Sequence, residues 1–203
     1  MTTLPYQVAI AMGTCTGTRG MLGFVINGEL VGTYNGWDSY PARPGLGQRV
    51  VDFIQTLSPD DCQKMDKLVG EITWVGEDDK VSTELQKYYL EVGLAYSYAT
   101  PDCLETWGTM LYKMQNGSAL SAIQSGALKH LTSRAGYLQD ALHCEWAYFI
   151  DFKNQMVDIW SFSEHVELVS FDTLKGDQDY MRKLSELPSR FKITESPDFP
   201  IQL

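Results

Sequence analysis

The chain has 203 residues, of which 44% are hydrophobic and 12% aromatic, and this composition excludes a largely disordered chain. Its net charge of −10 would be repelled by phosphate backbones and by anionic bilayers, so we expect neither a nucleic acid nor a membrane as a partner. We expect one globular cytoplasmic domain over residues 1–203, with an N-terminal extension at 1–16 and a polar tail at 192–203.

The first half of the chain begins with the clearest local signal, a β-hairpin. Apolar residues 21–26 are followed by Asn27-Gly28, which suits a type I′ turn, and residues 29–34 form the returning strand. An earlier strand is also predicted at 7–12. The remaining predicted elements are helices at 48–57, from Ser58-Pro59 to about 69, and from a Thr83 and Gln86 capping box to about 95, with a short strand at 72–75.

The second half contains another hairpin. Residues 144–150 and 156–162 are rich in aromatic and β-branched side chains, as strands require. The other predicted elements are helices at 100–114, 118–124 and 178–187 and a strand at 166–171. Two hairpins separated by helices predict an α+β fold, with an antiparallel sheet and helices packed against it.

The four cysteines, at 15, 62, 103 and 144, contain no closely spaced pair. A tetrahedral zinc site usually takes its ligands in such pairs, so we expect no metal and no cofactor. Buried free thiols are the simplest interpretation of these positions.

The unusual polar residues gather in the first hairpin and the turn after it. Arg19 precedes the first strand and Asp38 follows the second, and these two ends of a hairpin lie side by side. We therefore predict an Arg19–Asp38 pair, which would either tie down the turn or hold a guanidinium ready for a carboxylate or phosphate ligand. Asn35, Trp37, Ser39 and Tyr40 are the predicted ligand-binding residues beside it, although each also suits a structural turn.

Several of these residues fall into a recognisable order. The chain has Gly17-Thr18-Arg19-Gly20, then Tyr34-Asn35-Gly36-Trp37-Asp38-Ser39-Tyr40-Pro41 with Leu46-Gly47, and later Glu145 to Asp151 reading Glu-Trp-Ala-Tyr-Phe-Ile-Asp. This pattern resembles a family of small uncharacterised proteins of phages, bacteria and fungi. The resemblance covers about the first third and the later hairpin, and it implies no activity. The family often has His where this chain has Gly36, and residues 1–16 precede the pattern here.

A second resemblance concerns Cys15. Cys15-Thr16 followed by a hairpin and Trp37-Asp38 is similar to N-terminal-nucleophile amidohydrolases of the bile-salt-hydrolase kind. In that class the free α-amine of the nucleophile acts as the base, so 14 residues before Cys15 would have to be removed. The resemblance implies Cys15, Arg19 and Asp38 as catalytic residues.

Two functions follow as alternatives. The first is a small-ligand-binding or hydrolytic domain, acting on an acyl or amide group, with its site around the Arg19 loop and the turn at residues 35–40. The second is a non-catalytic protein-interaction protein, such as a phage-type inhibitor or accessory factor, that acts through an acidic surface. The partner is accordingly either a small molecule or a protein.

Overall fold

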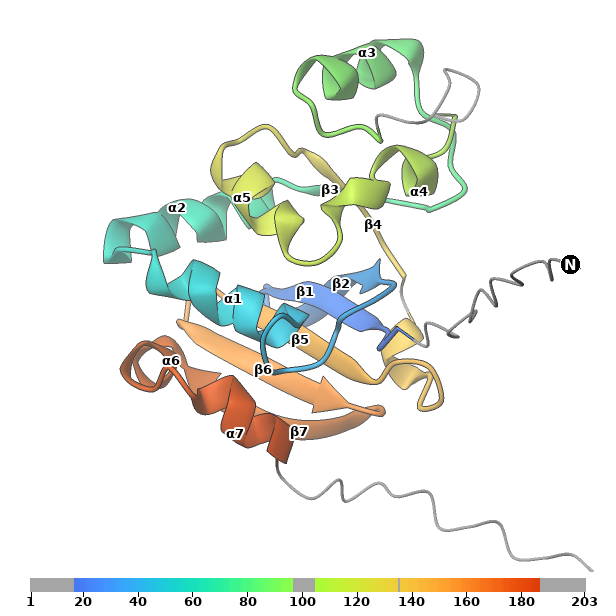
Figure 1. The fold of residues 1–203 in the computed structure, drawn as a ribbon. Coiled ribbons are helices and arrows are strands. Elements are labelled where there is room, and N and C mark those ends of the chain that lie inside the picture. The colour runs from blue at the N-terminus through green and yellow to red at the C-terminus, as the bar shows by residue number, and fades with distance from the viewer. Residues whose placement is uncertain (1–16, 97–104, 135, 187–203) are drawn as a thin grey trace, which may run out of the picture.

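The computed structural model describes residues 17–96, 105–134 and 136–186. Within these ranges the chain forms an α+β fold whose centre is a five-stranded sheet in the order β2-β1-β5-β6-β7 (Figure 1). The strands are β1 (Gly20–Ile26), β2 (Glu29–Asn35), β5 (Trp146–Asp151), β6 (Met156–Ser161) and β7 (Glu164–Ser170). The strand predicted at 7–12 lies outside the described residues.

Both predicted hairpins are present. In the first, Asn27 and Gly28 have φ angles of 53° and 84°, as a type I′ turn requires. In the second, β5 pairs antiparallel with β6, and the predicted third strand is β7, which pairs antiparallel with β6. The purely antiparallel sheet, however, is wrong, because β1 and β5 lie next to each other and run parallel. The sheet is therefore mixed.

A small second sheet joins β3 (Thr73–Val75) in parallel to β4 (His130–Thr132). The strand β4 was not predicted. The two sheets are linked through β2, where the Gly32 carbonyl oxygen accepts from the Arg134 amide at 3.3 Å and the Thr33 and Thr132 hydroxyls lie 3.0 Å apart. This link sets the small sheet and its neighbouring helices beside the turn that follows β2.

The helices agree with the sequence in most positions. They are α1 (Leu46–Gln55), α2 (Pro59–Gly70), α3 (Thr83–Glu91), α4 (Trp107–Met110), α5 (Ser118–Gln124), α6 (Phe171–Gly176) and α7 (Tyr180–Glu186), with the 3-10 helices η2 (Tyr112–Met114) and η3 (Tyr137–Gln139). The longest has 12 residues, and no described helix is both long and apolar enough to cross a membrane.

Two helix predictions need correction, and one further helix was not predicted. The N-cap of α3 is Ser82 rather than Thr83, because the Ser82 hydroxyl accepts from the Leu85 amide. The long helix predicted at 100–114 is instead the short α4 followed by η2, and its predicted start lies outside the described residues. The short α6 at the end of β7 was not predicted, although Ser170 caps it by accepting from the Thr173 amide.

The core lies mainly on one face of the large sheet, where α1, α6 and α7 pack (Figure 1). Buried sheet residues on this face include Leu22, Phe24, Tyr148 and Ile150. The other face carries a smaller cluster around Met21 and Phe149, which Tyr137 and Leu138 of η3 partly cover. The β1 strand is thus buried on both faces. Because β2 pairs with β1 along its whole length, the turn that follows β2 begins from a fixed position.

Candidate functional site

The turn after β2 is organised around Asn35, whose side chain is buried and fully bonded. Asn35 is only 1% exposed. Its Nδ2 donates to the Ser39 Oγ at 2.7 Å and to the Trp37 carbonyl oxygen, and its Oδ1 accepts from the Asn116 amide at 2.7 Å. Both Nδ2 hydrogens are used and the side chain is buried, so in this arrangement the role of Asn35 is structural.

Two further contacts support the same turn from elsewhere in the chain. The Tyr148 hydroxyl donates to the carbonyl oxygen of the fully buried Ser39 at 3.0 Å, and burial raises the pKa of Tyr148 well above its ordinary value. The Gly36 amide donates to the Gln115 Oε1 at 2.6 Å. The turn is therefore a rigid corner that joins β2 to β5 and to the segment after η2.

The predicted Arg19–Asp38 ion pair is absent: the ion pairs within 4.0 Å among the described residues do not include it. The two backbone segments do meet, since the Ser39 amide donates to the Thr18 carbonyl oxygen at 3.0 Å. Gly20, however, pairs with Asn35, so residues 36–38 loop out of the ladder.

Asp38 lies in that loop with a φ of 54°, whereas Arg19 is exposed. The acidic residue beside Arg19 is Glu145, whose Oε1 accepts from the Arg19 amide at 3.1 Å. Asp38 thus lies in the loop beyond the end of the β1–β2 ladder, and the Arg19 backbone bonds to Glu145 instead.

The thiols offer no nucleophile in the described part of the chain. Cys15 and Cys103 lie outside it, so the amidohydrolase-like role predicted for Cys15 stays a prediction. Cys62 and Cys144 are buried and free. Burial raises the pKa of both, to about 12 for Cys144, so neither is a thiolate near neutral pH.

Trp37 connects this corner to a group of aromatic side chains. Its ring centroid lies 5.2 Å from that of Tyr112, which in turn lies 5.4 Å from that of Tyr96. With its amide turned so that both polar atoms find partners, the Asn116 carboxamide would donate to the Trp37 carbonyl oxygen at 2.8 Å and accept from the indole N–H. Trp37 thus packs its ring against that of Tyr112.

Two adjoining cavities open around Tyr112, and together we call them the aromatic cleft. The outer cavity has a volume of about 380 Å³ and is lined by Glu77, Asp78, Tyr96, Thr106, Gly108, Thr109 and Tyr112. The inner one has about 100 Å³ and shares three of these residues, Glu77, Gly108 and Tyr112; it adds Thr33, Tyr34, Leu111, Met114, Gln115, Leu131 and Thr132.

The aromatic cleft has one fixed polar wall. Arg134 Nε and Nη2 both lie 2.9 Å from the Glu77 Oε2, and the Arg134 guanidinium lies 4.6 Å from the centroid of the Tyr34 ring. Glu77 also packs against Gly108, where an added Cβ would come within 2.5 Å of its Cγ. Glycine at 108 therefore lets the Glu77 carboxylate reach the cavity wall.

The predicted ligand-binding residues meet this cleft only in part. Trp37 contacts Tyr112, whereas Asn35, Ser39 and Tyr40 line neither cavity; Tyr34, which was not among them, lines the inner one. Tyr40 is half-buried, and its carbonyl oxygen accepts from the Gly47 amide at 3.3 Å.

Glu77 and Tyr112 of the cleft, and Arg134, which pairs with Glu77, were not predicted as site residues. Glu77 is part of a run of polar residues that reads as an ordinary loop, and Arg134 follows a strand that the sequence does not reveal. The aromatic residues Tyr96 and Tyr112 line the outer cavity, but the long helix predicted at 100–114 gave no reason to place them together.

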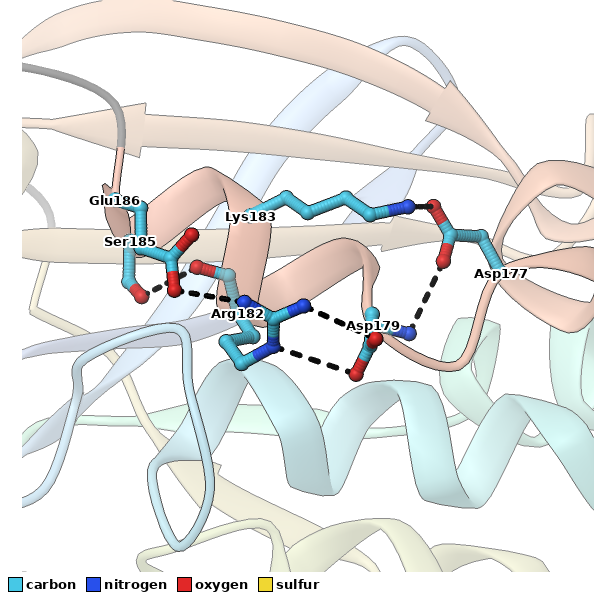
Figure 2. A network of polar contacts seen from close by, with 6 residues as sticks. All are labelled: Asp177, Asp179, Arg182, Lys183, Ser185 and Glu186. Atoms are coloured by element: carbon cyan, nitrogen blue, oxygen red, sulfur yellow. Dashed lines mark hydrogen bonds and ion pairs between the residues drawn. The ribbon is translucent and has the colours of Figure 1, made fainter.

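Two other polar regions lie away from the aromatic cleft. A cavity of about 600 Å³ lies at the opposite end of the strands, between the two hairpin turns and the end of α2, and Asp66, Lys67 and Lys153 help to line it. A network of charged side chains lies on α7 and just before it (Figure 2), where Arg182 contacts Asp179 and Glu186 at 3.0 Å and 2.7 Å.

The α7 network serves its own helix. All its ion pairs lie within residues 177–186, and their side chains are between 34% and 61% exposed, so they contribute little stability and line no cavity described above. Within the described ranges, no group of three or more His, Cys, Asp or Glu side chains could hold a metal ion. Comparisons of the chain with protein-family models, with curated proteins and with solved structures give no match.

Proposed function

We propose that the protein binds a small molecule in the aromatic cleft, beside the turn that follows β2. The observation that carries this proposal is the pair of adjoining cavities around Tyr112, one of about 380 Å³ and one of about 100 Å³. Ligand pockets commonly measure about 300–1,000 Å³ and combine aromatic walls with a few fixed polar groups. Tyr34, Tyr112 and Glu77 supply that combination here.

The polar groups of the cleft favour binding over acyl or amide hydrolysis. A hydroxyl nucleophile needs an adjacent base that takes its proton. The threonine hydroxyls of the cleft instead contact each other: Thr33 with Thr132 at 3.0 Å, and Thr106 with Thr109 at 3.2 Å. The described residues that line the cleft include no Cys, Ser, His or Lys. We therefore keep the binding part of the functional hypothesis and set its hydrolytic part aside.

The test is a thermal-shift screen of metabolites against the full chain and two variants. A ligand at 100 times its Kd should stabilise the protein by about 2.7 kcal/mol, which for this size raises the Tm by about 5–10 °C. Tyr112→Ala should abolish the shift, because it removes the ring shared by both cavities. The matched control is Leu142→Ala, which truncates a side chain that is 77% exposed and lines neither cavity.

Two results would contradict the proposal. One is a set of ligands whose shifts survive Tyr112→Ala unchanged, since their site would then lie elsewhere. The other is the absence of any ligand together with stable capture of a protein partner whose binding is lost when exposed carboxylates are neutralised. That second result would favour the rival function, a protein-interaction protein with an acidic surface.

A further inference from the structure

The charged residues that the structure describes in the lining of the outer cavity are both acidic. Glu77 and Asp78 carry carboxylates, and the described lining residues include no Lys, Arg or His. The whole chain has a net charge of −10, so its field adds to the local one and attracts cations.

One cation, Arg134, already pairs with Glu77. Both contacting nitrogens of Arg134 approach the Oε2 of Glu77, and its guanidinium lies over the Tyr34 ring. The Glu77 Oε1 receives no hydrogen bond from any described residue, and Asp78 is exposed with no ion pair in the described part of the chain. The Glu77 Oε1 and the Asp78 carboxylate are therefore available to a cation that enters the outer cavity.

Tyr112 and Tyr96 add a second feature that favours a cation. Their rings meet edge to face at 70°, and Tyr112 is 45% exposed despite its contact with Trp37. Aromatic faces attract organic cations through the ring quadrupole, and groups of such rings are a known way to hold quaternary ammonium groups. A carboxylate wall that faces tyrosine rings suits that class of ligand.

Resting on the proposed function, we infer that the outer cavity takes an organic ammonium group, which is held between the Tyr112 ring and the carboxylates of Glu77 and Asp78. The rest of such a ligand would extend toward the inner cavity, which is lined by Tyr34, Leu111 and Thr132 among others. Anionic and uncharged ligands of equal size would gain nothing from this wall.

The test is an amide NMR titration of the full chain with two probes, tetramethylammonium chloride and uncharged tert-butanol. The cation should shift the amides of Gly108 and Tyr112 in a saturable way, whereas tert-butanol at the same concentration should not. Sodium chloride at equal ionic strength controls for screening.

Variants separate the charge from the ring. Asp78→Asn should weaken cation binding by about three- to fivefold, as for a partly exposed ion pair. Asp66→Asn makes the same charge change at the opposite cavity and should leave the affinity unchanged. Tyr112→Phe keeps the ring and should retain binding, whereas Tyr112→Leu keeps an apolar side chain of similar reach and should weaken cation binding about fivefold or more.

The possible failures are distinguishable. Equal binding of both probes, or equal effects of Asp78→Asn and Asp66→Asn, overturns the ammonium inference while leaving a ligand site in the cleft. The same conclusion follows if neither probe binds but a ligand from the screen is lost in Tyr112→Ala. If screen ligands are indifferent to Tyr112→Ala, the proposed function fails as well.

Discussion

Substitution of Asn35 by alanine tests whether the turn after β2 is a structural corner. The Asn35 side chain makes three hydrogen bonds, to Ser39 Oγ, to the Trp37 carbonyl oxygen and from the Asn116 amide. At about 1 kcal/mol each, their loss costs about 3 kcal/mol, and the buried groups left unpaired raise the cost toward about 5 kcal/mol. For a chain of this size 3 kcal/mol lowers the Tm by about 6–12 °C.

Urea denaturation followed by fluorescence and circular dichroism measures this cost as a change in midpoint at constant slope. The matched control is Asn154→Ala. Asn154 is exposed, and its side chain donates only to Asp151 at 2.7 Å, so its loss should cost less than about 1 kcal/mol. The reasoning is refuted if Asn35→Ala is as stable as the control variant and instead loses ligand binding.

Three other outcomes are expected. Gly20→Ala should leave the protein misfolded, because the added Cβ would lie 1.8 Å from the Trp146 carbonyl oxygen. In the control variant Gly70→Ala the added Cβ meets nothing within 4 Å, so the urea midpoint of that variant should stay unchanged or rise slightly. Cys144, with its pKa raised to about 12, should resist iodoacetamide at pH 8 until urea unfolds the chain, as peptide mass spectrometry can show. Stability should fall on acidification below about pH 6.5, and less so in His130→Gln, because burial lowers the pKa of His130.

The sign of the His130 effect follows from its burial. The Tyr89 hydroxyl lies 2.9 Å from the His130 Nδ1 and accepts from the Lys129 amide at 3.1 Å. Removal from water disfavours the charged imidazolium, and this lowers the pKa of His130 in the folded chain. The unfolded chain therefore binds the proton more readily, so stability is complete above the unfolded pKa and is lost as the pH falls through the lowered folded pKa. A urea midpoint that rises on acidification would contradict this.

Local sequence signals predicted the local elements well. Asn27-Gly28 supplied both positive φ angles of the first turn. Ser58-Pro59 correctly began α2, where the Ser58 hydroxyl accepts from the Asp61 amide and the Asp61 carboxylate accepts from the Ser58 amide. In each case neighbouring residues supply the determining contacts, so a short window of sequence contains the information.

The mixed sheet was missed because it depends on contacts between distant residues. Gly20 pairs with Trp146, 126 positions along the chain, and no local pattern encodes that choice. One signal did exist: residues 20–24 of β1 are buried on both faces and read as a nearly continuous apolar run with two glycines. Such runs are typical of central strands with neighbours on both sides. The apolar run at residues 20–24 therefore indicates that β1 pairs with a second strand besides β2.

The candidate site was predicted in the right neighbourhood but with the wrong residues. The sequence singled out the polar turn at 35–40, and that turn proved to be internally bonded, with Trp37 in contact with the cleft. The loop at residues 36–38, which carries Asp38, lies between the buried Asn35 and Ser39, and this burial cannot be read from their polar character. Glu77 and Arg134 come together only through the pairing of β3 with β4.

The most direct test of the central claim is a map of amide chemical-shift changes caused by any ligand that the thermal-shift screen identifies. The account predicts changes concentrated at Glu77, Asp78 and residues 108–115, around the Tyr112 ring. Changes concentrated instead at Thr18, Arg19 and residues 38–40, with the Tyr112 region silent, would contradict it and would return the site to the hairpin end where the sequence first suggested it.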